Sequence, residues 1–303
     1  MTKRKAPAAP AAATLRRKRQ PERERAIAPS KPKLSPRSPG RRFKLTLEYD
    51  GTRYSGWQIQ ADAKTIQGAL AKAAATLFPG QPVEIQGCGR TDSGVHALHY
   101  VAHLAVATDL APLAITHGLN DALPKDIVVL AVERAGADFH ARHSCVARRY
   151  LYRIAKRKSA FEKKYVWWVR DRLNVGAMQR AARLMIGMHD FAAFAEKQEL
   201  KKSTRVLLHR VELAEEGDFI LIRVVGSHFL WKMVRRMVGI LVEVGRGNLT
   251  DDDVRQLLSG PSDLPARYTA PPSGLFFERA FYSEEELQEF LAEAGGTEPW
   301  QAP

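Results

Sequence analysis

The segment FKLTLEYDG, residues 43–51, alternates apolar and polar side chains along its length. The apolar positions are Phe43, Leu45, Leu47 and Tyr49. A period of two residues is typical of a strand that buries one face. The Asp-Gly pair at the end of the segment favours a turn. We therefore expect ordered structure to begin with a strand at Phe43.

The same kind of pattern predicts five further elements in the first half of the chain. Thr65 is placed to cap a helix whose apolar side chains share one face. Two strands, a second helix and a final strand follow this helix. The predicted ranges are a helix at 65–77, strands at 83–88 and 97–106, a helix at 112–122 and a strand at 127–132.

The second half repeats this order of elements without repeating the sequence. The predicted ranges are a strand at 145–155, a helix at 175–188, strands at 206–213 and 219–225, a helix at 229–244 and a strand at 275–282, with a short helix inserted at 251–258. Two βαββαβ units in tandem predict an α+β fold of two ferredoxin-like subdomains, with antiparallel sheets backed by helices. The expected boundaries are 43–137 and 138–287.

Residues 1–42 have a different composition, with seven prolines, many alanines and 14 Lys and Arg against two Glu. So few large apolar side chains cannot offset the entropy of ordering, and we expect a disordered basic tail. A plain basic tail is favoured over a nuclear-localisation or organelle-targeting segment, because a clear amphipathic stretch is missing. Residues 288–303 are expected to be a flexible C-terminus.

Most of the chain's net charge of +14 lies in this tail. A second basic segment is 142–172, where 11 Lys and Arg stand against two acidic residues. It can bind a phosphate backbone or be a solvated surface. No apolar run approaches the length of a membrane span. Two cysteines without a paired spacing, Cys88 and Cys145, favour a reducing compartment, the cytoplasm.

The predicted strand order also occurs in RNA-recognition motifs, which carry an aromatic-rich signature on their third strand. The corresponding residues 95–101 read VHALHYV. That signature is missing, so the sequence does not indicate this binding module.

Residues 89–97 read GRTDSGVHA and form the predicted loop between the second and third strands. Glycines on both sides allow a tight turn, and a loop held between two strands can present a carboxylate into a cleft. Asp92 is the carboxylate in this position. Taken only as a turn residue, an aspartate is more often structural, because it caps nearby amides.

This nonamer resembles the catalytic motif of the TruA-type tRNA pseudouridine synthases. The other similar segments are EYDGTRYSGWQIQ at 48–60, FHAR at 139–142 followed by ARRYLY at 147–152, MVRRMVG at 233–239 and APPSGL at 270–275. Together these segments span nearly all of the predicted ordered chain. One position departs from the family pattern: Tyr100 stands where the motif usually continues to a glutamine.

The resemblance implies an isomerase, an intramolecular transferase that converts uridine to pseudouridine at positions 38 to 40 of the tRNA anticodon stem-loop without a cofactor. It implies Asp92 as the catalytic carboxylate, in an RNA-binding cleft between the two subdomains. An ionised carboxylate can attack C1′, add to C6 or take the 2′ proton, and the sequence leaves these routes open.

Four substrate-binding residues also follow from the resemblance. Arg235 would form a buried bidentate pair with the catalytic carboxylate, and its neighbour Arg236 would then face elsewhere. Tyr150 would stack on the target base, Arg90 would help to extrude that base, and Leu275 would contact its other face. A core aromatic at Tyr150 and a core leucine at Leu275 are the structural alternatives.

The family further implies tRNA as the partner and a homodimer as the assembly. No metal site is expected, because His99 and His103 would share a strand face without a nearby cysteine pair. The rival hypotheses are a related synthase with another RNA site, a catalytically inert RNA-binding protein and a ferredoxin-like hydrolase. The motif residues argue against an inert protein, and the lack of a nucleophile–base pair argues against a hydrolase.

Overall fold

The computed structural model describes residues 41–196 and 203–293. The predicted basic tail lies outside the described residues except for Arg41 and Arg42, which already belong to the first strand. Residues 294–303 of the predicted flexible C-terminus also lie outside them.

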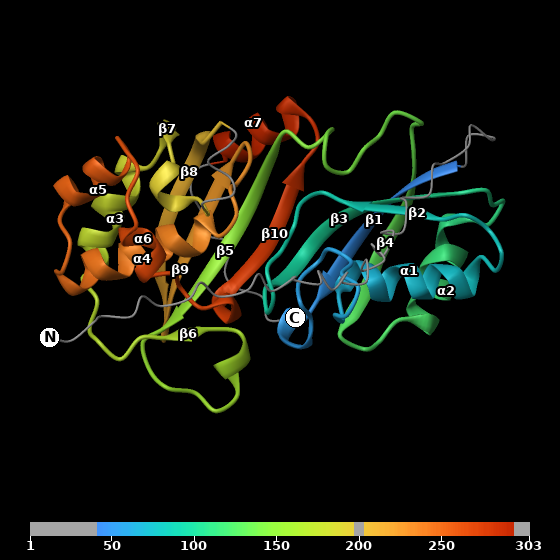
Figure 1. Ribbon diagram of the computed structural model, residues 1–303, viewed down its shortest axis with the longest axis horizontal. Helices are drawn as coiled ribbons and strands as arrows, with labels where there is room; N and C mark the ends of the chain where they lie inside the picture. The colour runs from blue at the N-terminus through green and yellow to red at the C-terminus, as the bar shows by residue number, and fades with distance from the viewer. Residues whose placement is uncertain (1–40, 197–202, 294–303) are drawn as a thin grey trace, which may run out of the picture. The chain divides into compact units, whose positions relative to one another are not determined.

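The strands in the described ranges form one sheet in the order β4-β1-β3-β10-β5-β9-β8-β7, with β2 paired to β3 and β6 paired to β5 (Figure 1). The strands are β1 (Arg41–Tyr49), β2 (Glu84–Gly87), β3 (His96–Val106), β4 (Ile127–Ala135), β5 (Ala147–Ala155), β6 (Trp167–Trp168), β7 (Gly187–Asp190), β8 (Arg205–Glu216), β9 (Phe219–Gly226) and β10 (Leu275–Phe281). The prediction of a multi-stranded sheet backed by helices is confirmed. The two halves share this one sheet, because β10 pairs antiparallel with β5 and parallel with β3.

The helices are α1 (Ile66–Leu77), α2 (Pro112–Ala122), α3 (Val175–Leu184), α4 (Met233–Arg246), α5 (Asp251–Leu257), α6 (Leu264–Arg267) and α7 (Glu284–Ala292). Short 3-10 turns are η1 (Gly51–Arg53), η2 (Glu162–Lys164), η3 (Ala192–Phe194) and η5 (Pro272–Gly274). Side-chain oxygens cap α1, α3, α5 and α7, from Thr65, Asn174, Thr250 and Ser283 respectively. Each cap accepts a backbone N–H that the first helical turn leaves unpaired.

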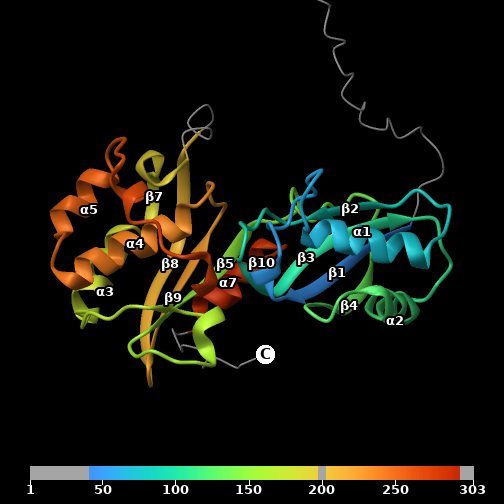
Figure 2. The same ribbon diagram turned by 60° about the horizontal axis from the view of Figure 1, so that its bottom comes forward.

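The first half of the sheet buries one face of β1. Its four predicted apolar residues are fully or almost fully buried, and the residues between them are partly exposed. They belong to the same core cluster as Ile66 and Leu70 of α1 and Ile115 of α2. Figure 2 shows these two helices against the strands of this half. The period of two residues therefore reflects a strand with one helix-covered face.

The second half covers both faces of β5, and all nine residues of this strand are buried. Neighbouring residues of β9 separate the two faces. Val224 belongs to the main core together with residues of α3 and α4, whereas Val225 packs with Phe281 and with Leu287 of α7. Helix α7 thus lies on the face opposite to α3 and α4 (Figure 2). Burial on both faces explains why β5 does not alternate as β1 does.

Two predicted helix boundaries were wrong. The helix predicted at 175–188 ends at Leu184, and Gly187, with a φ of 104°, begins strand β7 beside β8. Such a φ is open to glycine and interrupts a helix. The helix predicted at 229–244 begins only at Met233, after a turn closed by a hydrogen bond from the Met233 N–H to the Leu230 carbonyl oxygen.

The prediction of a flexible segment from residue 288 was wrong for its first residues. Helix α7 continues to Ala292, because Leu287 and Phe290 lie one turn apart and pack against the sheet. No helix of the described ranges has both the length and the apolar character needed to cross a membrane.

Candidate active site

The loop that carries Asp92 connects β2 to β3 and packs against the segment that follows β1. A Cβ on Gly51 would stand 1.9 Å from the carbonyl oxygen of Val95, and a Cβ on Gly56 would stand 2.4 Å from that of Thr91. Gly56 also has a φ of 89°, which other residues rarely adopt. The segments 48–60 and 89–97 are therefore packed backbone against backbone.

Tyr100 fixes the start of this loop. Its side chain is fully buried, and its hydroxyl donates to the carbonyl oxygen of Gly89 and lies 3.4 Å from the Gly89 nitrogen. Its ring packs on Trp57, with ring centres 4.3 Å apart. Gly87 leaves the room for this, since a Cβ there would stand 2.0 Å from the Tyr100 hydroxyl oxygen. Tyr100, the position at which the sequence departs from the expected motif, thus binds the loop backbone through its hydroxyl.

Asp92 points from the loop toward the first turn of α4. Its Oδ2 lies 2.9 Å from Nη1 of Arg235, and the two side chains are 19% and 13% exposed. The Nε of Arg235 donates to the carbonyl oxygen of Ala270 at 2.7 Å. The expected bidentate contact is therefore not formed, because one side of the guanidinium binds Asp92 and another binds the backbone before β10.

Arg236 faces away from the carboxylate. It is 5% exposed, donates to the carbonyl oxygen of Ala195, and has its Nη2 3.0 Å from Glu196. The two neighbouring arginines of α4 thus have separate surroundings, one in the site and one in the core.

Trp231 is a site residue that sequence analysis missed. Its indole Nε1 donates to Oδ1 of Asp92 at 2.9 Å, and its side chain is 43% exposed. No helical spacing signals it, because α4 begins only at Met233 and the left-handed Lys232 separates Trp231 from the helix.

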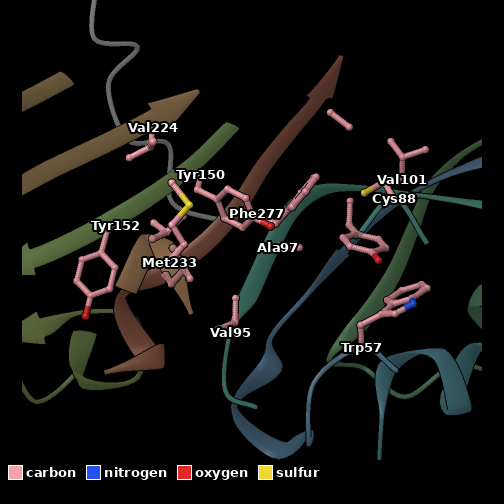
Figure 3. Close-up of a cluster of buried hydrophobic side chains, with 14 of the residues drawn as sticks. Trp57, Cys88, Val95, Ala97, Val101, Tyr150, Tyr152, Val224, Met233 and Phe277 are labelled. Atoms are coloured by element: carbon pink, nitrogen blue, oxygen red, sulfur yellow. The ribbon is translucent and has the colours of Figure 1, made fainter. Parts of the chain in front are cut away.

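Tyr150 and Leu275 form the apolar part of the site. Tyr150 of β5 is 8% exposed, and its ring meets that of Phe277 edge-on with centres 5.2 Å apart. Figure 3 shows Tyr150 beside Phe277 and close to Met233. Burial raises the pKa of Tyr150, so the phenol is protonated at neutral pH. Leu275 begins β10 and, like Tyr150, belongs both to the core cluster and to the lining of the site.

A cleft of about 1190 Å³ brings all five predicted site residues together. They are Arg90, Asp92, Tyr150, Arg235 and Leu275. Trp231 and Arg142 line the same cleft, so both halves of the chain contribute to it. Among the described residues that line it, Asp92 is the sole acidic side chain.

The arginines of this cleft are of two kinds. Arg235 and Arg148 are bound, the first to Asp92 and the second to the carbonyl oxygens of Cys88 and Ser227. Arg90 and Arg142 are exposed, and no ion pair joins their guanidinium groups to the described part of the chain. Cations without acidic neighbours are suited to phosphate groups.

The basic segment 142–172 is divided by the alternation of β5. Arg148 is turned toward the cleft, whereas Arg149 and Arg153 are buried on the opposite face and paired with glutamates. The other lysines and arginines of the segment are exposed. Three of the counted cations therefore hold the fold together, and the positive surface is smaller than the sequence count indicated.

Two of the three histidines of β3, His96 and His103, bind protein groups. His103 is buried, its Nδ1 accepts the N–H of Ala141 at 3.1 Å, and burial lowers its pKa to about 4. His96 is buried with its Nδ1 3.1 Å from a carboxylate oxygen of Asp50. His99 is exposed. Within 41–196 and 203–293, no three His, Cys, Asp or Glu side chains gather as a metal site would require.

This arrangement defines a class of protein. A directed carboxylate can act as a nucleophile or a general base, and unpaired arginines beside it can bind a polyanion. A protein that only binds phosphates gains nothing from an acidic group in its cleft. The arrangement is therefore suited to an enzyme whose substrate carries phosphate groups, as a nucleic acid does.

Known proteins resemble the chain over most of its length. A family model described as tRNA pseudouridine synthase matches residues 46–144 and 181–283. The chain is 40% identical over 244 residues to tRNA pseudouridine synthase A of Zymomonas mobilis, covering 80% of this chain and 99% of that protein. The proteins of the same name from Agrobacterium fabrum and Geobacter sulfurreducens are each 41% identical, over 80% and 79% of this chain and 93% and 98% of their own lengths. The chain belongs to the tRNA pseudouridine synthase family, whose members are isomerases.

Proposed function

We propose that this protein converts uridine to pseudouridine at positions 38 to 40 of the tRNA anticodon stem-loop, with Asp92 as the catalytic carboxylate and without a cofactor. The observation that carries the proposal is the placement of Asp92, the acidic side chain among the described residues of a cleft in which Arg90 and Arg142 form no ion pair with the described part of the chain. A phosphate backbone complements the cations, and a nucleoside extruded from it would reach the carboxylate. Family membership supports uridine isomerisation as the reaction.

The reaction requires one well-placed carboxylate. It breaks the bond from N1 to C1′, turns the uracil, joins C5 to C1′ and removes the C5 proton while N1 takes up a proton, with no net change in composition or redox state. Attack on C1′, addition to C6 and removal of the 2′ proton are each open to an ionised Asp92. In all three routes the carboxylate must keep its charge and its direction, and the contact with Arg235 supports both.

The remaining site residues are proposed to hold the substrate. Tyr150 and Leu275 are 8% and 6% exposed and both line the cleft, and they are proposed to contact the two faces of the planar base. Arg90 lies on the same loop as Asp92 and is proposed to bind the phosphate next to the extruded nucleotide.

We also propose that the chain consists of two ferredoxin-like subdomains, 43–137 and 138–287, with the RNA-binding cleft between them. The strand orders support this, since β4-β1-β3-β2 in the first half corresponds strand for strand to β10-β5-β9-β8 in the second. Residues of both halves line the cleft.

A homodimer that binds tRNA in the cytoplasm is part of the proposal. The family supports the tRNA partner, and buried free thiols at Cys88 and Cys145 suit a reducing compartment. Light scattering of the full-length protein tests the assembly. A mass of two chains at micromolar concentration is expected, and a mass of one chain, with and without tRNA, contradicts the dimer.

Pseudouridine mapping on unmodified tRNA transcripts tests the function. The purified protein, without added metal or cofactor, is expected to modify positions 38 to 40, and an Asp92→Ala variant is expected to leave no signal. Modification at other positions would keep the chemistry and refute the assigned site. Tight tRNA binding by the wild type without modification of any transcript would refute the function in favour of an inert RNA-binding protein.

A further inference from the structure

We propose that Trp231 is a positioning residue that sets the direction of the Asp92 carboxylate. This inference rests on the proposed function, in which Asp92 is the catalytic group. Trp231 Nε1 lies 2.9 Å from Oδ1, and Arg235 Nη1 lies 2.9 Å from Oδ2. One donor on each oxygen fixes both the place of the carboxylate and its rotation. The contact with Arg235 alone would leave the second oxygen free to turn.

The indole binds the second carboxylate oxygen, which Arg235 was expected to bind. A bidentate guanidinium would hold both carboxylate oxygens, but the Nε of Arg235 is bound to the Ala270 carbonyl oxygen. The oxygen that Arg235 does not reach is the one that receives the Trp231 N–H. Because an indole N–H donates and accepts nothing, this contact holds the carboxylate oxygen in place and exchanges no proton with it.

The residue that follows Trp231 has an energetically unfavourable backbone conformation. Trp57 is 2% exposed, whereas Trp231 is 43% exposed. The next residue, Lys232, has a φ of 63° and a ψ of 4°, and it is the sole non-glycine residue with positive φ in the described ranges. Side chains avoid this conformation unless the surroundings impose it, and such residues gather at functional sites.

Neighbouring contacts impose the conformation. Leu230 and Met233 are buried on either side of the turn, and the Met233 N–H binds the Leu230 carbonyl oxygen at 3.0 Å. The Lys232 ammonium lies 5.0 Å from the centre of the Trp231 ring and 2.6 Å from Glu196. The turn and the cation together hold the indole with its N–H edge toward the carboxylate.

Loss of the N–H should therefore slow the chemical step without weakening RNA binding. Trp231→Phe keeps an aromatic ring and removes the donor. A second variant with 3-benzothienylalanine at position 231 keeps the two-ring shape and replaces the N–H by sulfur. With unmodified tRNA transcript at saturating concentration, both variants are expected to lower the single-turnover rate constant about 10-fold and to leave the tRNA dissociation constant within about two-fold.

The matched control is Tyr268→Phe. Tyr268 is 37% exposed and does not line the cleft, and this change also removes a polar hydrogen while keeping the ring. Tyr268→Phe is expected to change neither the single-turnover rate constant nor the tRNA dissociation constant. A wild-type rate constant in the benzothienylalanine variant would overturn the inference. So would a loss of activity that is explained entirely by weaker tRNA binding.

An NMR measurement keeps this inference separable from the proposed function. The Trp231 indole N–H resonance of ¹⁵N-labelled protein is assigned as the one that disappears in Trp231→Phe. It is expected to move in Asp92→Ala and to stay in place in Tyr268→Phe. An active enzyme whose resonance does not respond to Asp92→Ala would refute the contact. An inactive wild type with a responding resonance would refute the proposed function and not the contact.

Discussion

The two walls of the cleft are built by different means. The loop that carries Asp92 is held by backbone packing. The backbone at Gly51 and Gly56 approaches the loop backbone more closely than a residue with a Cβ would allow. The opposite wall, at the start of α4, contributes side chains, Arg235 and Trp231, that bind the carboxylate directly. One wall thus places the Asp92 carboxylate and the other sets its direction, so substitutions in the two walls should affect different measured properties.

Among substitutions that leave Asp92 itself in place, the largest effect is expected when a side chain fills the space between residue 56 and the loop that carries Asp92. Gly56→Ala puts a Cβ 2.4 Å from the Thr91 carbonyl oxygen at a φ of 89°, so the loop must move. We expect a loss of about 3 kcal/mol in the free energy of unfolding, measured in urea, and at least a 100-fold loss of activity.

Gly80→Ala is the matched control for this prediction. Gly80 also has a positive φ, 73°, but nothing lies within 4 Å of the added Cβ. It should cost about 1 kcal/mol and leave the activity of the folded protein unchanged. Equal effects of the two substitutions would show that backbone strain, and not the packing of the loop that carries Asp92, is responsible.

Removing a side chain of the second wall that binds Asp92 should lower the rate constant more than the free energy of unfolding. Arg235→Met removes the charge that faces Asp92, and the single-turnover rate constant is expected to fall about 100-fold with little change in the free energy of unfolding. Arg236→Met should do the reverse, because it leaves Glu196 without this buried partner and costs about 3 kcal/mol. If both variants lose mainly the rate constant, or both lose mainly stability, the two arginines do not have the separate roles described.

Features with a local signal could be predicted from the sequence, and features made by distant contacts could not. The alternation from Phe43 to Tyr49 predicted β1 because one face of that strand is buried. The burial of Arg149 could not be predicted, since its partner Glu278 belongs to a strand far along the chain. The same reason hid the pairing of β10 with β3, which joins the two halves in one sheet.

The residues of the candidate site also differ in whether a local sequence signal pointed to them. The motif at 89–97 drew attention to Asp92, but Arg235 lies 143 residues away and was named through the family resemblance alone. Trp231 is 139 residues from Asp92 and falls just before the matching motif at 233–239. No periodicity reports such a contact, and only the geometry of the folded chain reveals it.

A smaller effect is expected from Tyr100, whose hydroxyl binds the start of the loop that carries Asp92. Tyr100→Phe removes the hydroxyl that binds Gly89 while its ring still packs on Trp57. We expect a loss of about 1 kcal/mol in stability and about a five-fold loss in rate constant. Tyr54→Phe is the control, since its hydroxyl binds Asp126 away from the loop. It should cost similar stability without slowing the reaction, and a rate constant unchanged in Tyr100→Phe would show that the hydroxyl does not hold the loop.

The smallest effect on the chemical step is expected from the unpaired arginines. Arg90→Ala and Arg142→Ala should each weaken tRNA binding several-fold and lower the slope of log affinity against log salt by about 1, with the rate constant at saturation largely kept. Arg134→Ala, an exposed arginine outside the cleft, is the control. Filter binding from 50 to 200 mM salt measures the slopes, and identical slopes in all three variants would exclude these arginines as phosphate contacts.

The most direct test of the account is the single-turnover rate of an Asp92→Asn variant with tRNA bound at saturation. Asparagine keeps the size of the side chain and an oxygen that can accept the Trp231 N–H, and it removes the charge that faces Arg235. We expect uridine isomerisation to slow at least about 1000-fold while the tRNA dissociation constant stays within about two-fold. A rate constant within 10-fold of the wild-type value would contradict the assignment of Asp92 as the catalytic carboxylate.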